Sequence, residues 1–406
     1  MAGKIKSKQM QRRSTNSSRS AVLQPRPKGE VLWVHATTPE RYLALCDIGR
    51  RLKTLRPDLS VLASWEPDLR LTGTVGCDIP VGPLAEDTLA EAREFVAHWR
   101  PDACIWTGPP ARRTLLRHLR DQGTGVLLAD LLDAEMPHRT SRWLPDQRRR
   151  MLEGLTCILT PSKTVRDRLI RLGFPAERLE VAGKLRVSAI PPGCNDDELA
   201  AMQQTLGSRP VWLAAHVKLN ELSRVLDAHR NALRLLHRLL LVVALDDIAD
   251  LEAARGLLQK SGLSFADWEN GGEPEDFNQV LLTSGEDIGL WYRLSPVALL
   301  ANSLDPAAQG QSPLDAAALG SALLHGPGIH AHRELYDRLT KAGAAVQVQT
   351  HNEMSDTVVA LSAPDRAAEM ALAGWQSVTE SAATTDTLLE KIQTLLDQRE
   401  DTNAGT

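Results

Sequence analysis

The chain has 406 residues, of which 43% are hydrophobic and 24% charged, values that are ordinary for a soluble globular protein of two domains. A net charge of -4 argues against a nucleic-acid-binding protein. The five cysteines lie far apart without a CxxC pair, which argues against a zinc site and fits reduced thiols in the cytoplasm. The longest apolar run, residues 239–245, is too short to span a bilayer, and no signal-peptide core is visible. We therefore expect a cytoplasmic protein, or a peripheral membrane protein.

Residues 1–29 contain eight basic residues and no acid. This composition predicts a disordered basic arm. Such an arm can attach a protein to an anionic lipid surface, with roughly 1 kcal/mol for each basic residue near that surface. A solvated tail without a role explains the same composition equally well.

Strands alternate with helices from residue 30 to residue 190. Strands are predicted at 31–36, 59–64, 78–82, 103–107, 125–130, 157–160 and 179–183. After the first strand, Thr38 and Pro39 are an N-cap and first-turn signal, and Glu40 falls in the first helical turn. The alternation predicts a parallel sheet that is covered by helices on both faces.

A linker with Pro191-Pro192-Gly193 precedes a second alternating region, which we predict to form a domain over residues 191–375. Its first strand, residues 210–216, has a Trp in its first half and His216 at its end, as the strand at 31–36 has Trp33 and His35. We therefore predict an α/β fold of two doubly wound, Rossmann-like domains. Closing helices are expected at 364–373 and 385–398, the latter within a closing segment 376–398, before a disordered tail at 399–406. Ligands of such sheets bind beyond the carboxyl ends of the strands, so His35, Glu40 and His216 are expected near one cleft.

A strand–loop–helix–strand unit lies between Ser303 and Pro327. Gly310 is in its loop, Ser312 is placed where an N-cap belongs, and Asp315 follows three residues later. The free N–H groups at the start of this short helix suit a phosphate. A capping box without any ligand is the alternative interpretation.

Several segments together resemble the 3-deoxy-D-manno-octulosonic acid (Kdo) transferases, which are glycosyltransferases of the GT-B type. The resemblance covers roughly residues 31–395 and rests on VLWVHATTPE, RPDACIW, LTPSKTVRDRLIRLG, VAGKLRV, VWLAAH, DAHR, EDIGLWY and residues 309–327. The family's donor-site pattern G-G-H-N-P-L-E-P-A-A-x-G-x-P-V-x-x-G-P keeps its order and spacing in residues 309–327. The resemblance implies two domains that face a cleft, an acceptor domain at 30–190 and a nucleotide-sugar domain at 191–375.

The resemblance also implies roles for individual residues. Glu40 matches the proposed catalytic base, although the motif from His35 to Glu40 is one residue shorter than the family's H-A-x-S-x-G-E. The helix start at Ser312 would take the donor phosphate, and Asp315 would reach a ribose hydroxyl, with Ser303 and Gly310 in the same donor site. The family's basic P-R-H falls on Ala244, Leu245 and Asp246, so the positive charge would have to come from Lys184, Arg186, His216 and Lys218.

Each of these roles has a structural alternative. Glu40 can simply complement a helix dipole, His35 and His216 can be satisfied strand-end histidines, and Lys184 and Arg186 can be solvated. Two functions therefore stay open. The first is a divergent glycosyltransferase at the cytoplasmic face of the inner membrane, which moves a sugar acid from a CMP-sugar to a lipid A-type or other glycolipid without a metal or further cofactor. The second is a non-catalytic relative that binds a sugar nucleotide or a partner protein.

Overall fold

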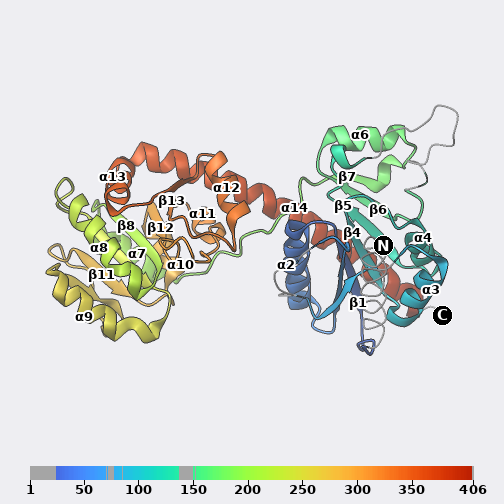
Figure 1. Ribbon diagram of the computed structural model, residues 1–406, viewed down its shortest axis with the longest axis horizontal. Helices are drawn as coiled ribbons and strands as arrows, with labels where there is room; N and C mark the ends of the chain where they lie inside the picture. Colours follow the sequence, from blue (N-terminus) through green and yellow to red (C-terminus); the bar gives the residue numbers. More distant parts are fainter. Residues whose placement is uncertain are drawn as a thin grey trace, which may run out of the picture. The chain divides into compact units, whose positions relative to one another are not determined.

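The computed structural model describes residues 24–69, 71, 77–84, 86–136, 150 and 152–404. Their contacts define two units. The first domain comprises Met1–Ser188 together with Glu380–Thr406, and the second comprises Ala189–Thr379. Each domain contains a sheet of seven parallel strands (Figure 1). The two doubly wound, Rossmann-like α/β domains that the sequence predicts are therefore confirmed, whereas the cleft expected between them stays a prediction.

The sheet of the first domain has the strand order β3-β2-β1-β4-β5-β6-β7. Its strands are β1 Val31–Ala36, β2 Ser60–Trp65, β3 Ile79–Pro83, β4 Ala103–Thr107, β5 Gly125–Ala129, β6 Cys157–Thr160 and β7 Leu179–Val181. Its helices are α2 Pro39–Leu55, α3 Leu89–Trp99, α4 Arg113–Asp121, α6 Lys163–Arg171 and the short η1 Asp133–Glu135 and η2 Ala176–Arg178.

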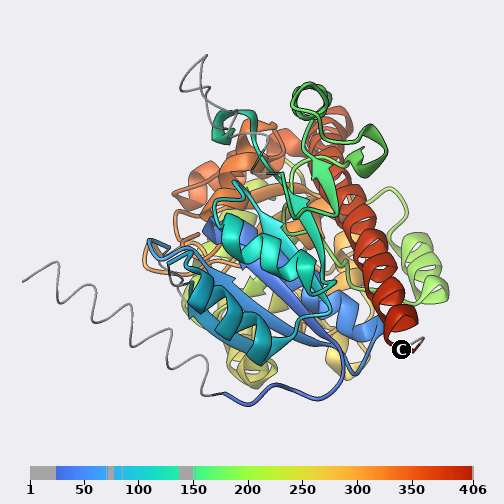
Figure 2. The same cartoon turned by 90° about the vertical axis from the view of Figure 1, so that its right-hand side faces the viewer.

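Apolar side chains point to both faces of this sheet, and helices bury each face in a separate core. On one face, Trp33 and Trp106 pack with residues of α3 and α4. On the other face, α2 packs beside the C-terminal part of the last helix, α14 (Pro364–Ala404), which contributes Leu388 and Ile392 (Figure 2). The start of α2 agrees with the sequence signal, because the Thr38 hydroxyl accepts a hydrogen bond from the Arg41 N–H.

The sheet of the second domain has the order β10-β11-β9-β8-β12-β13-β14. Its strands are β8 Val211–Val217, β9 Leu240–Leu245, β10 Phe265–Asp267, β11 Val280–Thr283, β12 Val297–Leu300, β13 Ala322–His325 and β14 Ala345–Gln347. Its helices are α7 Asp196–Leu206, α8 Leu219–Ala232, α9 Leu251–Ser261, α10 Ile288–Leu294, α11 Leu314–Ala318, α12 Arg333–Lys341, α13 His351–Leu361 and the first part of α14, with η3 Ile248–Asp250 and η4 Trp268–Asn270.

Strand order reverses at the first strand of each domain, between β1 and β4 and between β8 and β12. In doubly wound sheets, ligands bind beyond the carboxyl ends of the strands at such a switch point. In the second domain the register of β8 against β9 shifts between Ala214 and Val217, and His216 has a φ of 57°. This bulge changes the direction of the His216 side chain at the strand end.

The closing helices differ from the sequence prediction, because α14 runs without a break over 41 residues. We expected two separate helices, at 364–373 and 385–398. However, the hydroxyls of Thr379, Thr384 and Thr385 donate to carbonyls four residues earlier, so these side chains are satisfied within the helix. The helix also continues to Ala404 through residues that we expected to be a disordered tail.

The predicted basic arm is only partly described. Residues 24–29 pack on the first domain, where Arg26 donates to the Trp99 carbonyl at 2.9 Å and His98 donates to the Gln24 carbonyl at 2.8 Å. The expected disorder of these six residues is therefore wrong, and residues 1–23 lie outside the described part. Of the helix predicted at 147–155, residues 147–149 and 151 also lie outside it, and residues 152–154 form a turn. Among the described residues, no helix combines the length and the apolar character that a membrane crossing requires.

Candidate functional site

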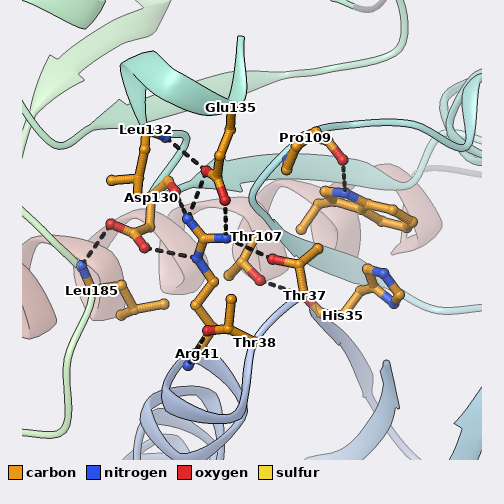
Figure 3. Close-up of polar contacts among 11 residues, drawn as sticks. His35, Thr37, Thr38, Arg41, Thr107, Pro109, Asp130, Leu132, Glu135 and Leu185 are labelled. Carbon is orange, nitrogen blue, oxygen red and sulfur yellow. Dashed lines mark hydrogen bonds and ion pairs between the residues drawn. The ribbon is translucent and has the colours of Figure 1, made fainter. Parts of the chain in front are cut away.

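A buried arginine links the segments that follow β1 and β5 at the carboxyl edge of the first sheet (Figure 3). Arg41 is 3% exposed, and its Nη1 atom lies 2.7 Å from Oγ1 of Thr37, which follows β1. Its Nε donates to Oδ2 of Asp130 at 2.8 Å, and its two Nη atoms lie 2.7 and 2.8 Å from the Glu135 carboxylate. Asp130 in turn accepts the Leu185 N–H at 3.2 Å. We call Arg41, Thr37, Asp130 and Glu135 the arginine clamp.

The clamp affects the pKa of Glu135 and restricts the residue at position 108. Burial alone would raise the pKa of Glu135, but the hydrogen bonds from Arg41 and from the Leu132 N–H hold it below its ordinary value. Gly108 follows β4 with a φ of 69°, and a Cβ there would lie 2.5 Å from Oγ1 of Thr37 and 2.7 Å from Nη1 of Arg41. A glycine is therefore required where the chain passes the clamp.

His35 lies beside the clamp at the end of β1 and is completely buried. Its ring stacks on Trp106 with centroids 3.9 Å apart, while Nδ1 lies 2.9 Å from Oγ of Ser64 and Nε2 lies 3.4 Å from Oε1 of Glu66. Burial lowers the pKa of His35, so the ring is neutral at pH 7. Arg112 donates to the second oxygen of Glu66 at 3.2 Å.

Three predicted site residues belong to the same edge of the first domain. Glu40 is the second residue of α2, directly before Arg41, and is half-buried. Lys184 is exposed and Arg186 is half-buried, and they flank Leu185, whose N–H contacts Asp130. The structure therefore brings Glu40, Lys184 and Arg186 to one region around the clamp.

A second group of predicted residues borders a groove in the second domain. Lys218 and Gly310 line it together with residues from the start of α8 and the loop after β12, including Asn220, Glu221, Asn302, Asp305 and Gln311. Glu221 shapes this groove, because its carboxylate accepts the N–H groups of Asn302 and Leu304 at 2.5 and 2.7 Å. Gly310 has a φ of 77°, and a Cβ there would lie 2.9 Å from the Gly328 carbonyl oxygen.

The polar side chains at this edge gather around Asp246. Gln311 donates to its Oδ1 at 2.9 Å, and Nδ1 of His216 and Nζ of Lys218 lie 3.8 and 4.0 Å from its carboxylate. Burial lowers the pKa of His216, so this ring carries no charge at pH 7. Lys218 is therefore the cation of this cluster, and Asp246 offsets its charge.

The helix at residue 314 corrects part of the sequence prediction. Pro313 rather than Ser312 occupies the N-cap position of α11, no side chain caps this five-residue helix, and the Ser312 hydroxyl lies 3.5 Å from the Leu314 N–H. Asp315 is half-buried, and burial raises its pKa.

Ser303 is buried and has a structural role in place of the predicted ligand contact. It is 0% exposed, donates to the Leu300 carbonyl at 2.6 Å and accepts the Gly326 N–H at 2.8 Å. Its hydroxyl proton is therefore engaged within the chain, and it joins the loops that follow β12 and β13. We therefore assign Ser303 the role of joining these two loops rather than that of contacting a ligand.

Several site residues were missed from the sequence. Asp130 and Glu66 directly follow β5 and β2, so the strand-end rule that selected His35 could have selected them as well. Arg41 had no such signal, since a basic residue early in a helix ordinarily faces solvent and only the fold shows that it is buried.

The chain is similar in sequence to several proteins that share one description. A family model described as 3-deoxy-D-manno-octulosonic-acid transferase (kdotransferase) matches residues 9–189. A 3-deoxy-D-manno-octulosonic acid transferase of Haemophilus influenzae is 22% identical over 387 residues, which cover 92% of this chain and 88% of that protein. A probable mitochondrial 3-deoxy-D-manno-octulosonic acid transferase of Arabidopsis thaliana is 22% identical and covers 82% of this chain and 77% of the relative.

Among solved structures, the C-terminal CMP-Kdo binding domain of WaaA from Acinetobacter baumannii is 22% identical with a TM-score of 0.43, covering 45% of this chain and 96% of that domain. The two sheets and their strand-end sites place the chain in the class of doubly wound α/β proteins with two Rossmann-like domains. Within that class, the chain is similar to the Kdo transferases, through the family model over residues 9–189 and through relatives at 22% identity over most of its length.

Proposed function

We propose that the protein is a glycosyltransferase that moves a sugar acid from a CMP-linked donor to a glycolipid acceptor of the lipid A type. The observation that carries this proposal is the groove at the carboxyl edge of the second sheet, which Lys218 and Gly310 line in a chain that is similar to the Kdo transferases over most of its length. A nucleotide in this groove would lie at the switch point beside His216, Asp246 and Gln311.

The proposed reaction joins the anomeric carbon of the donor sugar to an acceptor oxygen. The acceptor O–H bond breaks as the new C–O bond forms, the bond from the anomeric carbon to the phosphate breaks, and cytidine monophosphate leaves with the electron pair. Glu40 is the proposed base that takes the hydroxyl proton. Its place in the first turn of α2, beside the clamp, gives it a fixed backbone at the strand edge.

Nucleotide binding is the first test. Calorimetric titration of the full chain with cytidine monophosphate should release or absorb heat, and titration with uridine diphosphate should give a weaker response. Replacing Gly310 with Val should abolish the response, because a side chain there would meet the Gly328 carbonyl. The absence of heat with either nucleotide at millimolar concentration would reject a nucleotide-sugar donor.

The role of Glu40 is tested by its amide variant. Glu40→Gln keeps the size of the side chain but removes the base, which typically costs about 10²–10⁴-fold in rate. The loss of a helix-dipole partner would instead cost only about 0.3–1 kcal/mol of stability. Turnover at the wild-type rate with a slightly lowered melting temperature would show that Glu40 only complements the helix end.

Asp246 favours a second candidate, a non-catalytic relative that binds a sugar nucleotide or a partner protein. Its carboxylate lies 4.0 Å from Nζ of Lys218 and so offsets the positive charge that would stabilise a departing phosphate. Nucleotide binding without transfer to any glycolipid acceptor, in an assay where the H. influenzae relative is active, would favour this alternative.

A further inference from the structure

A chain of hydrogen bonds at the switch point of the first domain ends in the Glu66 carboxylate. Trp33 donates from Nε1 to Oγ of Ser64 at 2.8 Å, and Oγ lies 2.9 Å from Nδ1 of His35. The other ring nitrogen of His35, Nε2, lies 3.4 Å from Oε1 of Glu66. Arg112 approaches the opposite oxygen, Oε2, at 3.2 Å.

The directions of these bonds follow from the groups involved. An ionised carboxylate only accepts hydrogen bonds, so Nε2 of His35 must carry the ring proton. In the neutral ring Nδ1 is then an acceptor, and the Ser64 hydroxyl donates to it while accepting from Trp33. All four groups are therefore paired in one arrangement, which fixes the position and the negative charge of Glu66.

The surroundings of Glu66 are unlike those of an ordinary ion pair. His35 and Ser64 are completely buried, whereas the Glu66 side chain keeps 29% of its surface exposed. Each carboxylate oxygen has one protein donor and a remaining lone pair. The hydrogen bond from His35 lowers the pKa of Glu66, and Arg112 acts in the same direction, so the carboxylate is a poor proton acceptor and a strong hydrogen-bond acceptor.

We propose that Glu66, held by His35 and Arg112, binds a hydroxyl group of the acceptor sugar next to the hydroxyl that attacks the donor. This assignment rests on the proposed glycosyltransferase function and adds an acceptor-binding residue to it. A neutral hydroxyl fits better than a cation, because Arg112 already balances the charge of Glu66. No proton is transferred to Glu66, which separates its role from that of Glu40.

The test measures transfer from CMP-Kdo to a lipid A-type acceptor with Glu66→Gln, Glu66→Asp and the control Glu153→Gln. Glu153 is 45% exposed and pairs with Arg117 on the outside of the same domain. We expect Glu66→Gln to raise the acceptor KM about 10- to 100-fold, as the loss of a hydrogen bond to a charged group predicts. Glu66→Asp should give a smaller rise, while kcat, its pH profile and the donor KM stay within about threefold of wild type and the control is unchanged.

Direct binding keeps the test decisive if no transfer is detected. A glucosamine disaccharide, the sugar part of such an acceptor, is titrated into the wild-type chain and into Glu66→Gln, and the melting temperature of each is recorded. Weaker binding by the variant at an unchanged melting temperature supports the assignment, even where the transferase proposal fails. Equal binding overturns it, as does transfer with an unaltered acceptor KM. A kcat loss that removes a limb of the pH profile would make Glu66 a base and would also overturn it.

Discussion

Nε of Arg41 lies 2.8 Å from Oδ2 of Asp130, and this contact joins the first turn of α2 to the end of β5 inside the first domain. The two residues are 89 positions apart in the chain, and both are buried. Asp130 has a φ of 54°, which places its side chain at the strand end toward the guanidinium. The segment that carries Glu40 is therefore fixed by a charged contact rather than by apolar packing alone.

Removal of this contact should destabilise the first domain. Arg41→Met keeps the length of the side chain but leaves Asp130 and Glu135 without their cation, and breaking a buried pair in this way costs about 3–5 kcal/mol. Urea denaturation measures the loss. Arg50→Met on the same helix, where the arginine is 61% exposed, should change stability by less than about 0.5 kcal/mol. Similar stability for both variants would contradict a structural role of the clamp.

Gly108 offers an independent test of the clamp. Gly108→Ala places a methyl group within 2.7 Å of Arg41. It should lower the free energy of unfolding, measured by thermal denaturation, by more than the cost of a left-handed alanine, which is about 1 kcal/mol. Gly123→Ala is the matched control, since Gly123 has a φ of 77° but only the flexible end of Arg399 nearby. Equal losses of stability in the two variants would mean that the clamp accommodates the methyl group without an added cost.

His229 should make the second domain sensitive to acid. Trp212 donates to its Nδ1 at 3.1 Å, its Nε2 lies 2.9 Å from the Gln279 carbonyl, and burial lowers its pKa to about 4. Below pH 6.5 the unfolded chain binds a proton at this residue and the folded chain does not. Stability should therefore fall by up to about 1.4 kcal/mol per pH unit from pH 6.5 down to about 4.

Hydrogen exchange of peptides from β8 and β9 at several pH values would follow this loss. His229→Gln cannot titrate and should flatten the pH dependence, whereas His237→Gln, at an exposed position of the same domain, should leave it unchanged. A variant at position 229 with the wild-type slope would show that another group controls the acid response.

The basic residues before position 24 should promote contact with membranes. Residues 1–23 include six lysines and arginines and no acid, and each can contribute roughly 1 kcal/mol near an anionic surface. A chain that begins at Gln24 keeps the contacts of Arg26 with Trp99 and should fold normally. Sedimentation with anionic vesicles at low and high salt compares it with the full chain, and equal binding would exclude a membrane role for this segment.

The sequence predicted the alternation of elements well because strands such as β1 are continuous apolar runs and α2 begins with a strong capping signal. Glu40, His216 and Lys218 were selected because they follow predicted strands. The long-range partners were not predictable in this way. The burial of Arg41 depends on Asp130 and Glu135, which reach it only through the order of strands in the sheet.

The prediction of a break in α14 failed for a different reason. Serine and threonine clusters favour loops in short windows, but their hydroxyls are satisfied by carbonyls of the preceding helical turn. The N-cap prediction at Ser312 was displaced by one residue, since Pro313 is compatible with both the loop and the cap position. Local signals therefore identified the elements, and tertiary contacts decided where they end.

The C-terminal part of α14 also determines when the first domain can be completed during synthesis. Leu388, Ile392 and Leu396 belong to the core that covers α2, yet the ribosome makes them only after the whole of residues 189–379. The second domain can therefore form its core before the C-terminal part of α14 is available to cover the apolar face of α2. The domain that is translated first is completed last, and its nascent chain exposes an apolar surface to chaperones until α14 emerges.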